Sequence, residues 1–150
     1  MFNMDELQAR LDQLKEGLRR SGVKLTNQRI EICLEIARAD NHPDAEQVYK
    51  GVRERLPGIS LDTVYRTLWL LLELGLINSL GTPRDSIRFD GNIAPHHHFV
   101  CTKCGAAYDF CSRDFDQLQV PEEVQTYGIV QKTQVEVKGI CRQCSKTTEK

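Results

Sequence analysis

The chain has 150 residues, of which 40% are hydrophobic, and its formal net charge is −1. This length suits one ordinary globular domain, or two small domains that need added stabilisation. Residues 1–80 carry 11 basic and 12 acidic side chains and the remainder carries 9 of each, so the bulk charge lacks the basic footprint common in nucleic-acid binders. Any binding to nucleic acid must therefore depend on where individual side chains are placed.

No secretory or membrane-spanning segment is expected. The N-terminus contains Asp5 and Glu6 and lacks the apolar stretch of a signal peptide, and the longest apolar cluster, residues 68–72, ends at Glu73. We therefore expect a cytoplasmic protein whose six cysteines stay reduced and serve metal binding more readily than disulfides.

Leucine spacing and capping residues predict four helices in the first part of the chain, over residues 4–20, 27–39, 45–56 and 61–74. Thr26, Asp44 and Ser60 are suitable N-caps, whereas Gly22 and Gly75 follow the first and fourth helices in the position that favours glycine. In the second helix, an apolar stripe is expected at Ile30, Cys33, Leu34 and Ala37.

Residues 76–80 and 86–90 are expected to form a β-hairpin around the Gly and Pro of residues 81–85. Two helices joined by a short glycine-containing turn and followed by a hairpin constitute a winged helix.

The fourth helix is expected to have two faces. Thr63 and Arg66 lie opposite its apolar stripe, where they could meet phosphates or base edges; a plain solvent face is the alternative. Tyr65 falls at the edge of the stripe, where core packing and a contact are equally plausible, and Trp69 and Leu70 are expected to pack against neighbouring helices.

Residues 91–95 combine Gly and Pro in a short irregular run, which predicts a hinge between a domain of residues 1–90 and a second domain of residues 96–150. The second domain is expected to contain strands over 96–100, 106–111 and 129–137, with helical turns over 115–127 that are interrupted by Pro121. The predicted fold class is therefore α+β.

Two Cys-x-x-Cys pairs are the strongest chemical signal. Cys101 and Cys104 form one pair, closed by Gly105, and Cys141 and Cys144 form the other. Four thiolates suit a tetrahedral structural Zn²⁺ that leaves no open position for a substrate, and four unrelated buried thiols are the alternative.

Three consecutive histidines precede the first cysteine pair. On a strand, His96 and His98 share one face, whereas His97 points to the other. Asp90 and Asp109 are oxygen donors that could reach the same point, and mixed histidine and carboxylate ligation suits Fe²⁺, Mn²⁺ or Zn²⁺. The alternative is that these acids are ordinary solvated carboxylates.

Three further side chains have weaker signals. His42 precedes a proline in a polar loop, where solvation is usual. Cys33 is expected to be a small core side chain. Strand alternation places Cys111 on the same face as Asp109, so we hypothesise that its thiol lies near the histidines, with a buried spectator as the alternative.

Several motifs together resemble those of the ferric uptake regulator (Fur) family of bacterial metal-dependent repressors. The resemblance spans nearly the whole chain and is carried by residues 25–29 (LTNQR), His42-Pro43, Ser60 with residues 63–68 (TVYRTL), residues 88–90 (RFD), the run from His96 to Gly105, Asp109-Phe110, and Gly139 with Cys141 and Cys144.

The resemblance implies an N-terminal winged-helix DNA-binding domain and a C-terminal αβ dimerisation domain with a Cys₄ zinc. It implies a homodimer that represses transcription by binding palindromic double-stranded DNA, and it does not imply an enzyme. The implied DNA contacts are Arg29, Ser60, Thr63, Tyr65 and Arg66. The implied ligands of a regulatory Fe²⁺ or Mn²⁺ are His42, Asp90, His96, His98 and Asp109.

The signal implied by the resemblance is peroxide. Iron-sensing members usually have Glu at the position of Asp109, whereas peroxide sensors resemble this chain in having Asp. A further metal site of many iron sensors is not expected, because Pro95 precedes the histidine pair and Lys132 and Thr133 stand where another histidine would be. In the peroxide-sensing branch, iron-dependent oxidation of a ligand, here His42 or His96, releases the metal and then the DNA.

Two other functions remain open. An iron-responsive repressor of the same family is the nearer alternative, with a zinc-responsive one more distant. A metal-dependent hydrolase with a metal-activated water is an alternative of another class, but no general base is evident.

Overall fold

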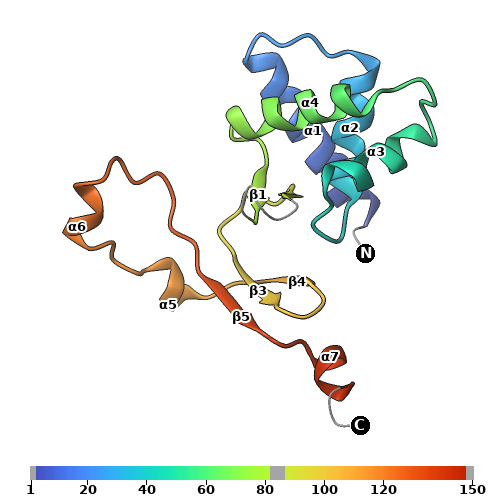
Figure 1. Ribbon diagram of the computed structural model, residues 1–150. Helices are drawn as coiled ribbons and strands as arrows, with labels where there is room; N and C mark the ends of the chain where they lie inside the picture. Colours follow the sequence, from blue (N-terminus) through green and yellow to red (C-terminus); the bar gives the residue numbers. More distant parts are fainter. Residues whose placement is uncertain (1–2, 82–86, 148–150) are drawn as a thin grey trace. The chain divides into compact units, whose positions relative to one another are not determined.

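The computed structural model describes residues 3–81 and 87–147 and divides into two compact units, Met1–Ile93 and Ala94–Lys150. The first unit contains four helices and a two-stranded sheet, and the second contains a three-stranded sheet with three short helices (Figure 1). The α+β fold class predicted from the sequence is confirmed.

The helices of the first unit are α1 (Met4–Arg20), α2 (Asn27–Arg38), α3 (Ala45–Arg53) and α4 (Leu61–Glu73). Their N-caps are those expected: the side chains of Thr26, Asp44 and Ser60 each accept a hydrogen bond from a backbone N–H in the first turn. Gly22 and Gly75 adopt positive φ angles of 74° and 69° just after α1 and α4, which explains why glycine stands at both positions.

Strands β1 (Asn78–Leu80) and β2 (Arg88–Asp90) pair antiparallel, with Ser79 opposite Phe89. The antiparallel pairing of the predicted hairpin is thereby confirmed. Residues 82–85 of its predicted turn and residue 86 of its predicted second strand lie outside the described residues. Four helices followed by this hairpin give the predicted winged helix.

The hydrophobic core of the first unit draws on all four helices and on β2. Its fully buried members are Leu18, Ile32, Cys33, Val48, Val52, Val64, Leu68 and Leu71, each 0% exposed. The stripe predicted for α2 was partly wrong, because Ile32 and Ile36 are buried while Ile30 and Leu34 are only partly so. Since α2 packs against α1, α3 and α4, its buried surface is broader than a single stripe.

An ion-pair network holds α2 against the end of α3. The guanidinium of Arg55 pairs with Glu31 and lies 3.0 Å from the carboxylate of Glu35. Gly51 of α3 faces Glu35 so closely that an added Cβ would collide with its carboxylate. Glycine at this position therefore leaves room for the Glu35 carboxylate where it pairs with Arg55.

The second unit contains β3 (His97–Cys101), β4 (Ala107–Phe110), α5 (Arg113–Asp116), α6 (Glu122–Gln125), β5 (Glu136–Gly139) and α7 (Arg142–Lys146). Strand β3 is central, antiparallel to β4 and parallel to β5. Helices α5 and α6 lie in the long connection between β4 and β5 (Figure 1), where Pro121 is the N-cap of α6.

The strand predicted over residues 129–137 was wrong in its start, because β5 begins only at Glu136. Strand β3 is five residues long, and its last four pair with β5, from His98 opposite Glu136 to Cys101 opposite Gly139. Residues 129–135 have the alternating pattern of a strand, but β3 does not extend far enough to pair with their backbone, so they do not continue β5.

Candidate functional site

The four predicted zinc ligands come together in the second unit. Cys101 ends β3, Cys104 lies in the turn that follows, and Cys141 and Cys144 lie at the start of α7 and within it. Because β3 and β5 run parallel, the chain leaving β5 reaches α7 beside the end of β3. The four sulfur atoms lie within 4.8 Å of one another, with 3.8 Å between those of Cys104 and Cys141.

Electrostatics of the four thiols favour a bound cation. Backbone N–H groups, first that of Cys104 and then that of Cys141, lower the pKa of Cys101 to about 6, whereas the neighbouring Cys141 and Cys104 side chains raise the pKa of Cys144 to about 12. Hydrogen bonds among the thiols thus favour the protonated form of Cys144, and a divalent cation would take the place of the shared protons and allow all four thiols to deprotonate. Four convergent sulfur donors fit tetrahedral Zn²⁺.

A second donor group in the same unit consists of His96, His98 and Asp109. The antiparallel register of β3 and β4 places Asp109 directly opposite His98. The Oδ1 atom of Asp109 lies 3.2 Å from His98 Nε2 and 3.8 Å from His96 Nε2, and the two Nε2 atoms are 3.0 Å apart. Nitrogen and oxygen donors in this combination suit Fe²⁺ or Mn²⁺.

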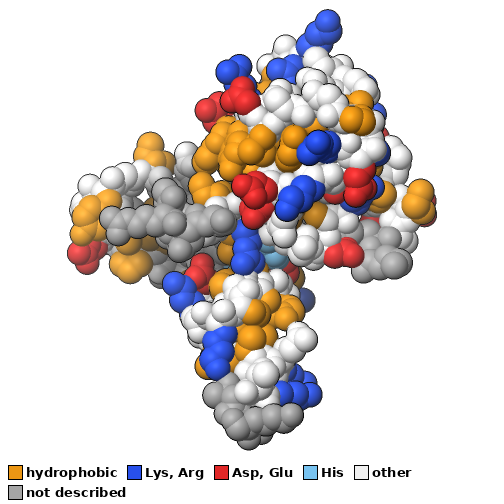
Figure 2. Space-filling model, turned by 45° about the vertical axis from the view of Figure 1, so that its right-hand side comes forward, with side chains coloured by type: hydrophobic (Ala, Val, Ile, Leu, Met, Phe, Trp, Pro, Cys, Tyr) orange, Lys and Arg blue, Asp and Glu red, His pale blue; other side chains and the backbone are white. Residues whose placement is uncertain are grey.

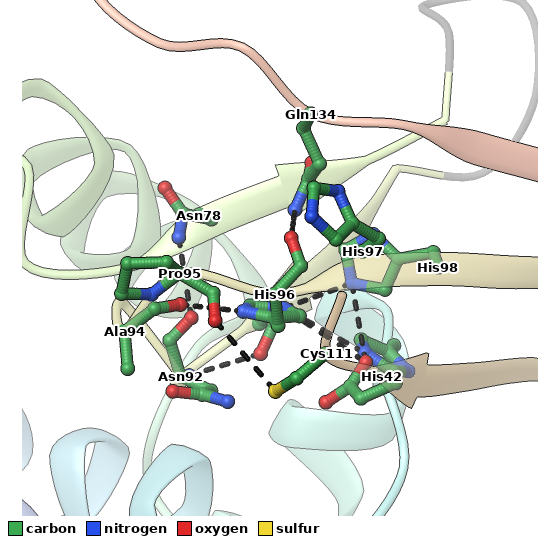
Figure 3. A network of polar contacts seen from close by, with 12 residues as sticks. His42, Asn78, Asn92, Ala94, Pro95, His96, His97, His98, Cys111 and Gln134 are labelled. Atoms are coloured by element: carbon green, nitrogen blue, oxygen red, sulfur yellow. Dashed lines mark hydrogen bonds and ion pairs between the residues drawn. The ribbon is translucent and has the colours of Figure 1, made fainter. Parts of the chain in front are cut away.

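The ring of His96 is oriented by its own backbone neighbourhood. Its Nδ1 atom lies 2.7 Å from the carbonyl oxygen of Ala94 (Figure 3). A carbonyl can only accept, so Nδ1 carries the proton and Nε2 carries the lone pair. This tautomer presents Nε2 as a metal donor.

His42 and Asp90 lie together in the first unit, with 3.5 Å between His42 Nε2 and Asp90 Oδ2. The loop between α2 and α3 runs alongside β2: the Phe89 N–H donates to the Pro43 carbonyl at 2.8 Å, and Asp44 forms a β-bridge with Arg88. Backbone pairing therefore brings to Asp90 a histidine that the local sequence alone placed in a solvated loop.

Residues predicted to contact DNA lie at the starts of α2 and α4. Arg29 donates to the Lys24 carbonyl at 2.7 Å, and the Ser60 side chain accepts from the Thr63 N–H at 3.1 Å. Arg66 pairs with Asp62 at 2.9 Å on the exposed surface of α4, and Tyr65 is 40% exposed.

The packing predicted for Trp69 was wrong. Its side chain is 45% exposed and meets Phe89 of β2 edge-on, with 6.5 Å between ring centroids. Leu70 packs partly buried against the core, as expected. Helical spacing gives the direction of a side chain but not which neighbour, helix or hairpin, lies there.

Cys111 is exposed, and its sulfur points to the carbonyl oxygen of Pro95 at 3.8 Å (Figure 3). Pro95 directly precedes His96, so the thiol lies close to the start of the histidine run. Because Cys111 is exposed, it is not the buried spectator of the alternative. Cys33 is a core side chain as predicted, and burial raises the pKa of its thiol to about 11.

One interaction near the histidines was not predicted, the contact between His97 and Asp116 of α5, 2.9 Å apart. Strand alternation placed His97 on the other face of the strand from His96 and His98. Nothing in the local sequence indicated which side chain between β4 and β5 would contact it.

Comparisons with known proteins match residues 20–139 to the Ferric uptake regulator family. The peroxide-responsive repressor PerR of Staphylococcus epidermidis is 29% identical over 142 residues, which cover 94% of each chain. The Campylobacter jejuni peroxide stress regulator is 27% identical with a TM-score of 0.66, covering 89% of this chain and 98% of its own. The Helicobacter pylori ferric uptake regulator Fur shares the fold, with a TM-score of 0.74 at 24% identity and 97% coverage of both chains.

The chain therefore belongs to the Ferric uptake regulator family. Its residues include two donor groups that fit the metals expected from the sequence, four thiols for Zn²⁺ and histidine with aspartate for Fe²⁺ or Mn²⁺. Within residues 3–81 and 87–147, every helix is too short or too polar to cross a bilayer.

Proposed function

We propose that the protein is a cytoplasmic, homodimeric repressor that binds palindromic double-stranded DNA and releases it when peroxide oxidises a metal-ligand histidine. The observation that carries this proposal is the group of His96, His98 and Asp109 in a Ferric uptake regulator family chain that also contains a winged helix. Its family relative in S. epidermidis is a peroxide-responsive repressor, and the C. jejuni protein is a peroxide stress regulator.

The proposed DNA-binding surface is the exposed side of α4 with the start of α2. Arg66 and Tyr65 are exposed there, Thr63 and Ser60 begin α4, and Arg29 lies in the first turn of α2. A helix N-terminus with hydroxyl and guanidinium groups can bind phosphates and read base edges in the major groove. This local arrangement compensates for the absence of a large net positive charge.

The proposed regulatory metal takes ligands from both units: His42 and Asp90 from the first, and His96, His98 and Asp109 from the second. A metal that needs all of them binds one relative orientation of the units most tightly, so it shifts the dimer toward that orientation. DNA binding then depends on metal occupancy because the same orientation sets the spacing of the two DNA-binding units.

Peroxide as the signal is supported by Asp109 and by the absence of a further histidine at Pro95, Lys132 and Thr133. Bound Fe²⁺ would supply the one-electron reduction of peroxide next to its ligands, with Fe³⁺ as the oxidised product, whereas Mn²⁺ would do so poorly. We propose His42 and His96 as the side chains that gain oxygen. An oxidised imidazole is a poorer donor, so the metal and then the DNA are released.

The proposed dimer is supported by apolar surface on the second unit. Tyr127, Ile129 and Ile140 are 78%, 94% and 49% exposed, and Figure 2 shows hydrophobic side chains on the surface of this unit. These side chains are available to pack against a second copy of the chain, as the proposed dimer requires.

Mass spectrometry tests the proposal directly. Protein loaded with Fe²⁺ or Mn²⁺ is given a brief low dose of H₂O₂, and peptides containing His42 or His96 are examined for one added oxygen. A gain with Fe²⁺ and none with Mn²⁺ supports peroxide sensing. No gain with either metal, together with Fe²⁺-dependent DNA binding, would identify an iron-responsive repressor instead.

A DNA-binding titration separates the repressor from a hydrolase. Binding to a palindromic duplex should require the regulatory metal and should weaken steeply as salt rises. A zinc-responsive repressor would bind DNA with Zn²⁺ in the histidine site and would ignore Fe²⁺ and Mn²⁺, while a hydrolase would show no such DNA binding.

A further inference from the structure

Three consecutive histidines create an ambiguity that β3 must resolve. All three carry the same imidazole group, and a strand that slips by one residue exchanges its two faces. Such a slip would withdraw His96 and His98 from the proposed metal site and present His97 in their place. Something in the structure must therefore hold the register and keep His97 away from the metal.

His97 is engaged at both ring nitrogens. Its Nδ1 atom accepts a hydrogen bond from the Val135 N–H at 3.1 Å, and its Nε2 atom lies 2.9 Å from the Asp116 carboxylate. A backbone N–H can only donate, so Nδ1 holds the lone pair and Nε2–H donates to Asp116. Neither nitrogen retains a lone pair for a metal.

Aromatic packing holds the same ring in place. His97 is 1% exposed, and its ring contacts Phe110 of β4 and Phe115 of α5, with ring centroids 5.7 and 5.5 Å away. The two phenyl rings also contact each other, with 6.0 Å between centroids. Rotating this ring toward the other face of the sheet would break two hydrogen bonds and two aromatic contacts together.

The chain entering β5 contacts all three histidines in succession. Gln134 donates to the His96 carbonyl at 3.0 Å (Figure 3). The Val135 N–H donates to the His97 ring, and the Val135 carbonyl accepts from the His98 N–H at 3.1 Å. Of these three contacts, only the one to the His97 ring depends on a histidine side chain. The contacts to the His96 carbonyl and the His98 N–H involve backbone groups that almost any residue provides, so the His97 contact alone is specific to one register.

We infer that His97 is a positioning residue that is withheld from metal binding: with Asp116 and Val135 it locks the register of β3, so that His96 and His98 present their donors beside Asp109. This role rests on the proposed regulatory metal. It predicts that residues on the face of β3 opposite that site control metal affinity without touching the metal.

The tautomer is tested in the wild-type protein carrying structural zinc alone. Long-range ¹H–¹⁵N correlation NMR should show His97 as the neutral Nε2–H form, and adding Zn²⁺ to the second site should move the ¹⁵N signals of His96 and His98 far more than those of His97. An Nδ1–H tautomer, or a His97 signal that moves as much as its neighbours, would overturn the inference.

The register lock is tested by measuring Mn²⁺ affinity and the absorption spectrum of bound Co²⁺, after confirming one structural zinc per chain. His97→Phe retains an aromatic ring but loses both hydrogen bonds, and we expect Mn²⁺ binding to weaken at least tenfold, as changes around metal ligands do. Asp116→Ala should weaken it in the same direction. Asp114→Ala makes the same change in the same helix, two residues away, and should match wild type.

Partial rescue distinguishes positioning from general destabilisation. His97→Gln can still donate toward Asp116 and His97→Asn can still accept from Val135, so both should bind Mn²⁺ more tightly than His97→Phe and retain a wild-type Co²⁺ spectrum. If His97→Phe fails to fold, the comparison of Asp116→Ala with its control Asp114→Ala provides the test instead. Unchanged affinity in Asp116→Ala and His97→Phe would contradict the lock alone, whereas a wild-type chain that binds no Mn²⁺ would contradict the proposed function.

Discussion

His96 and Cys33 show how the surroundings of a side chain set its protonation state. The Ala94 carbonyl fixes the His96 tautomer at 2.7 Å, so that Nε2 presents its lone pair beside Asp109. Burial raises the pKa of the Cys33 thiol to about 11, so this thiol stays protonated and has no lone pair of a thiolate to offer. One side chain is prepared for a ligand and the other is kept inert.

The Cys33 thiol should make the first unit less stable in alkali. Folding raises the pKa of this thiol from 9.0 to about 11, so the unfolded chain loses the proton at lower pH than the folded chain does. The contribution of the neutral thiol to the free energy of unfolding is therefore fully present below pH 9 and is lost as the pH rises through 11. The full loss is on the order of 3 kcal/mol. Denaturant unfolding followed by Trp69 fluorescence should show this fall, and Cys33→Ala should show a flatter profile between pH 9 and 11. Parallel profiles for the two proteins would refute the assignment.

The residues that could be foreseen from sequence are those whose spacing alone defines geometry. Two Cys-x-x-Cys pairs predicted the sulfur cluster, and strand alternation correctly separated His97 from its neighbours. The proximity of His42 to Asp90 could not be derived from local sequence, because it depends on the pairing of the Pro43 loop with β2. The same is true of Asp116, whose position depends on how the α5 connection folds back.

At the scale of elements, α4 combines a buried side with an exposed polar side. Val64, Leu68 and Leu71 are buried, and on the exposed side Arg66 pairs with Asp62 of the preceding turn. Helix boundaries were predictable within a few residues because caps and glycines mark them. The start of β5 was not, because it depends on the length of β3, a property of the partner strand.

The α4 surface gives a pair of opposite expectations. Arg66→Ala should weaken binding to DNA of any sequence and reduce the slope of log affinity against log salt by about one, if Arg66 contacts a phosphate. Asp62→Ala removes the competing carboxylate and should leave affinity unchanged or higher. Fluorescence anisotropy across a salt series measures both, and an Arg66→Ala protein with wild-type affinity and slope would exclude the contact.

At the scale of the whole molecule, the hydrophobic core is divided unequally. The buried core cluster lies between Leu14 and Phe89, in the first unit. Among residues 94–147, the only buried hydrophobic side chains are Cys101 and Cys141, two of the four cysteines proposed to bind zinc. We therefore expect the second unit to depend on the proposed zinc for much of its stability.

Removing zinc should unfold the second unit selectively. A strong chelator under reducing conditions should abolish amide hydrogen-exchange protection in β3 and β5 while α2 and α4 remain protected. Cys104→Ser should reproduce this without chelator, and Cys111→Ser, a matched change outside the four thiols, should not. Loss of protection throughout the chain would mean that the two units fold as one.

The exposed apolar side chains of the second unit should control assembly. Ile129→Asp places a charge on the most exposed of them and should shift the chain from dimer to monomer in sedimentation experiments. Met4→Asp, at an exposed apolar position in the first unit, serves as the control and should remain dimeric. A dimeric Ile129→Asp protein would place the interface elsewhere.

The unequal core also bears on how long each molecule survives. A chain deprived of zinc would keep a folded first unit and carry the unfolded residues 94–150, which is the kind of substrate that cellular proteases engage. Zinc supply would then set the abundance of the protein, whereas the metal proposed for the histidine site would set its activity. One chain would thus report on two metals through two different quantities, its lifetime and its occupancy of DNA.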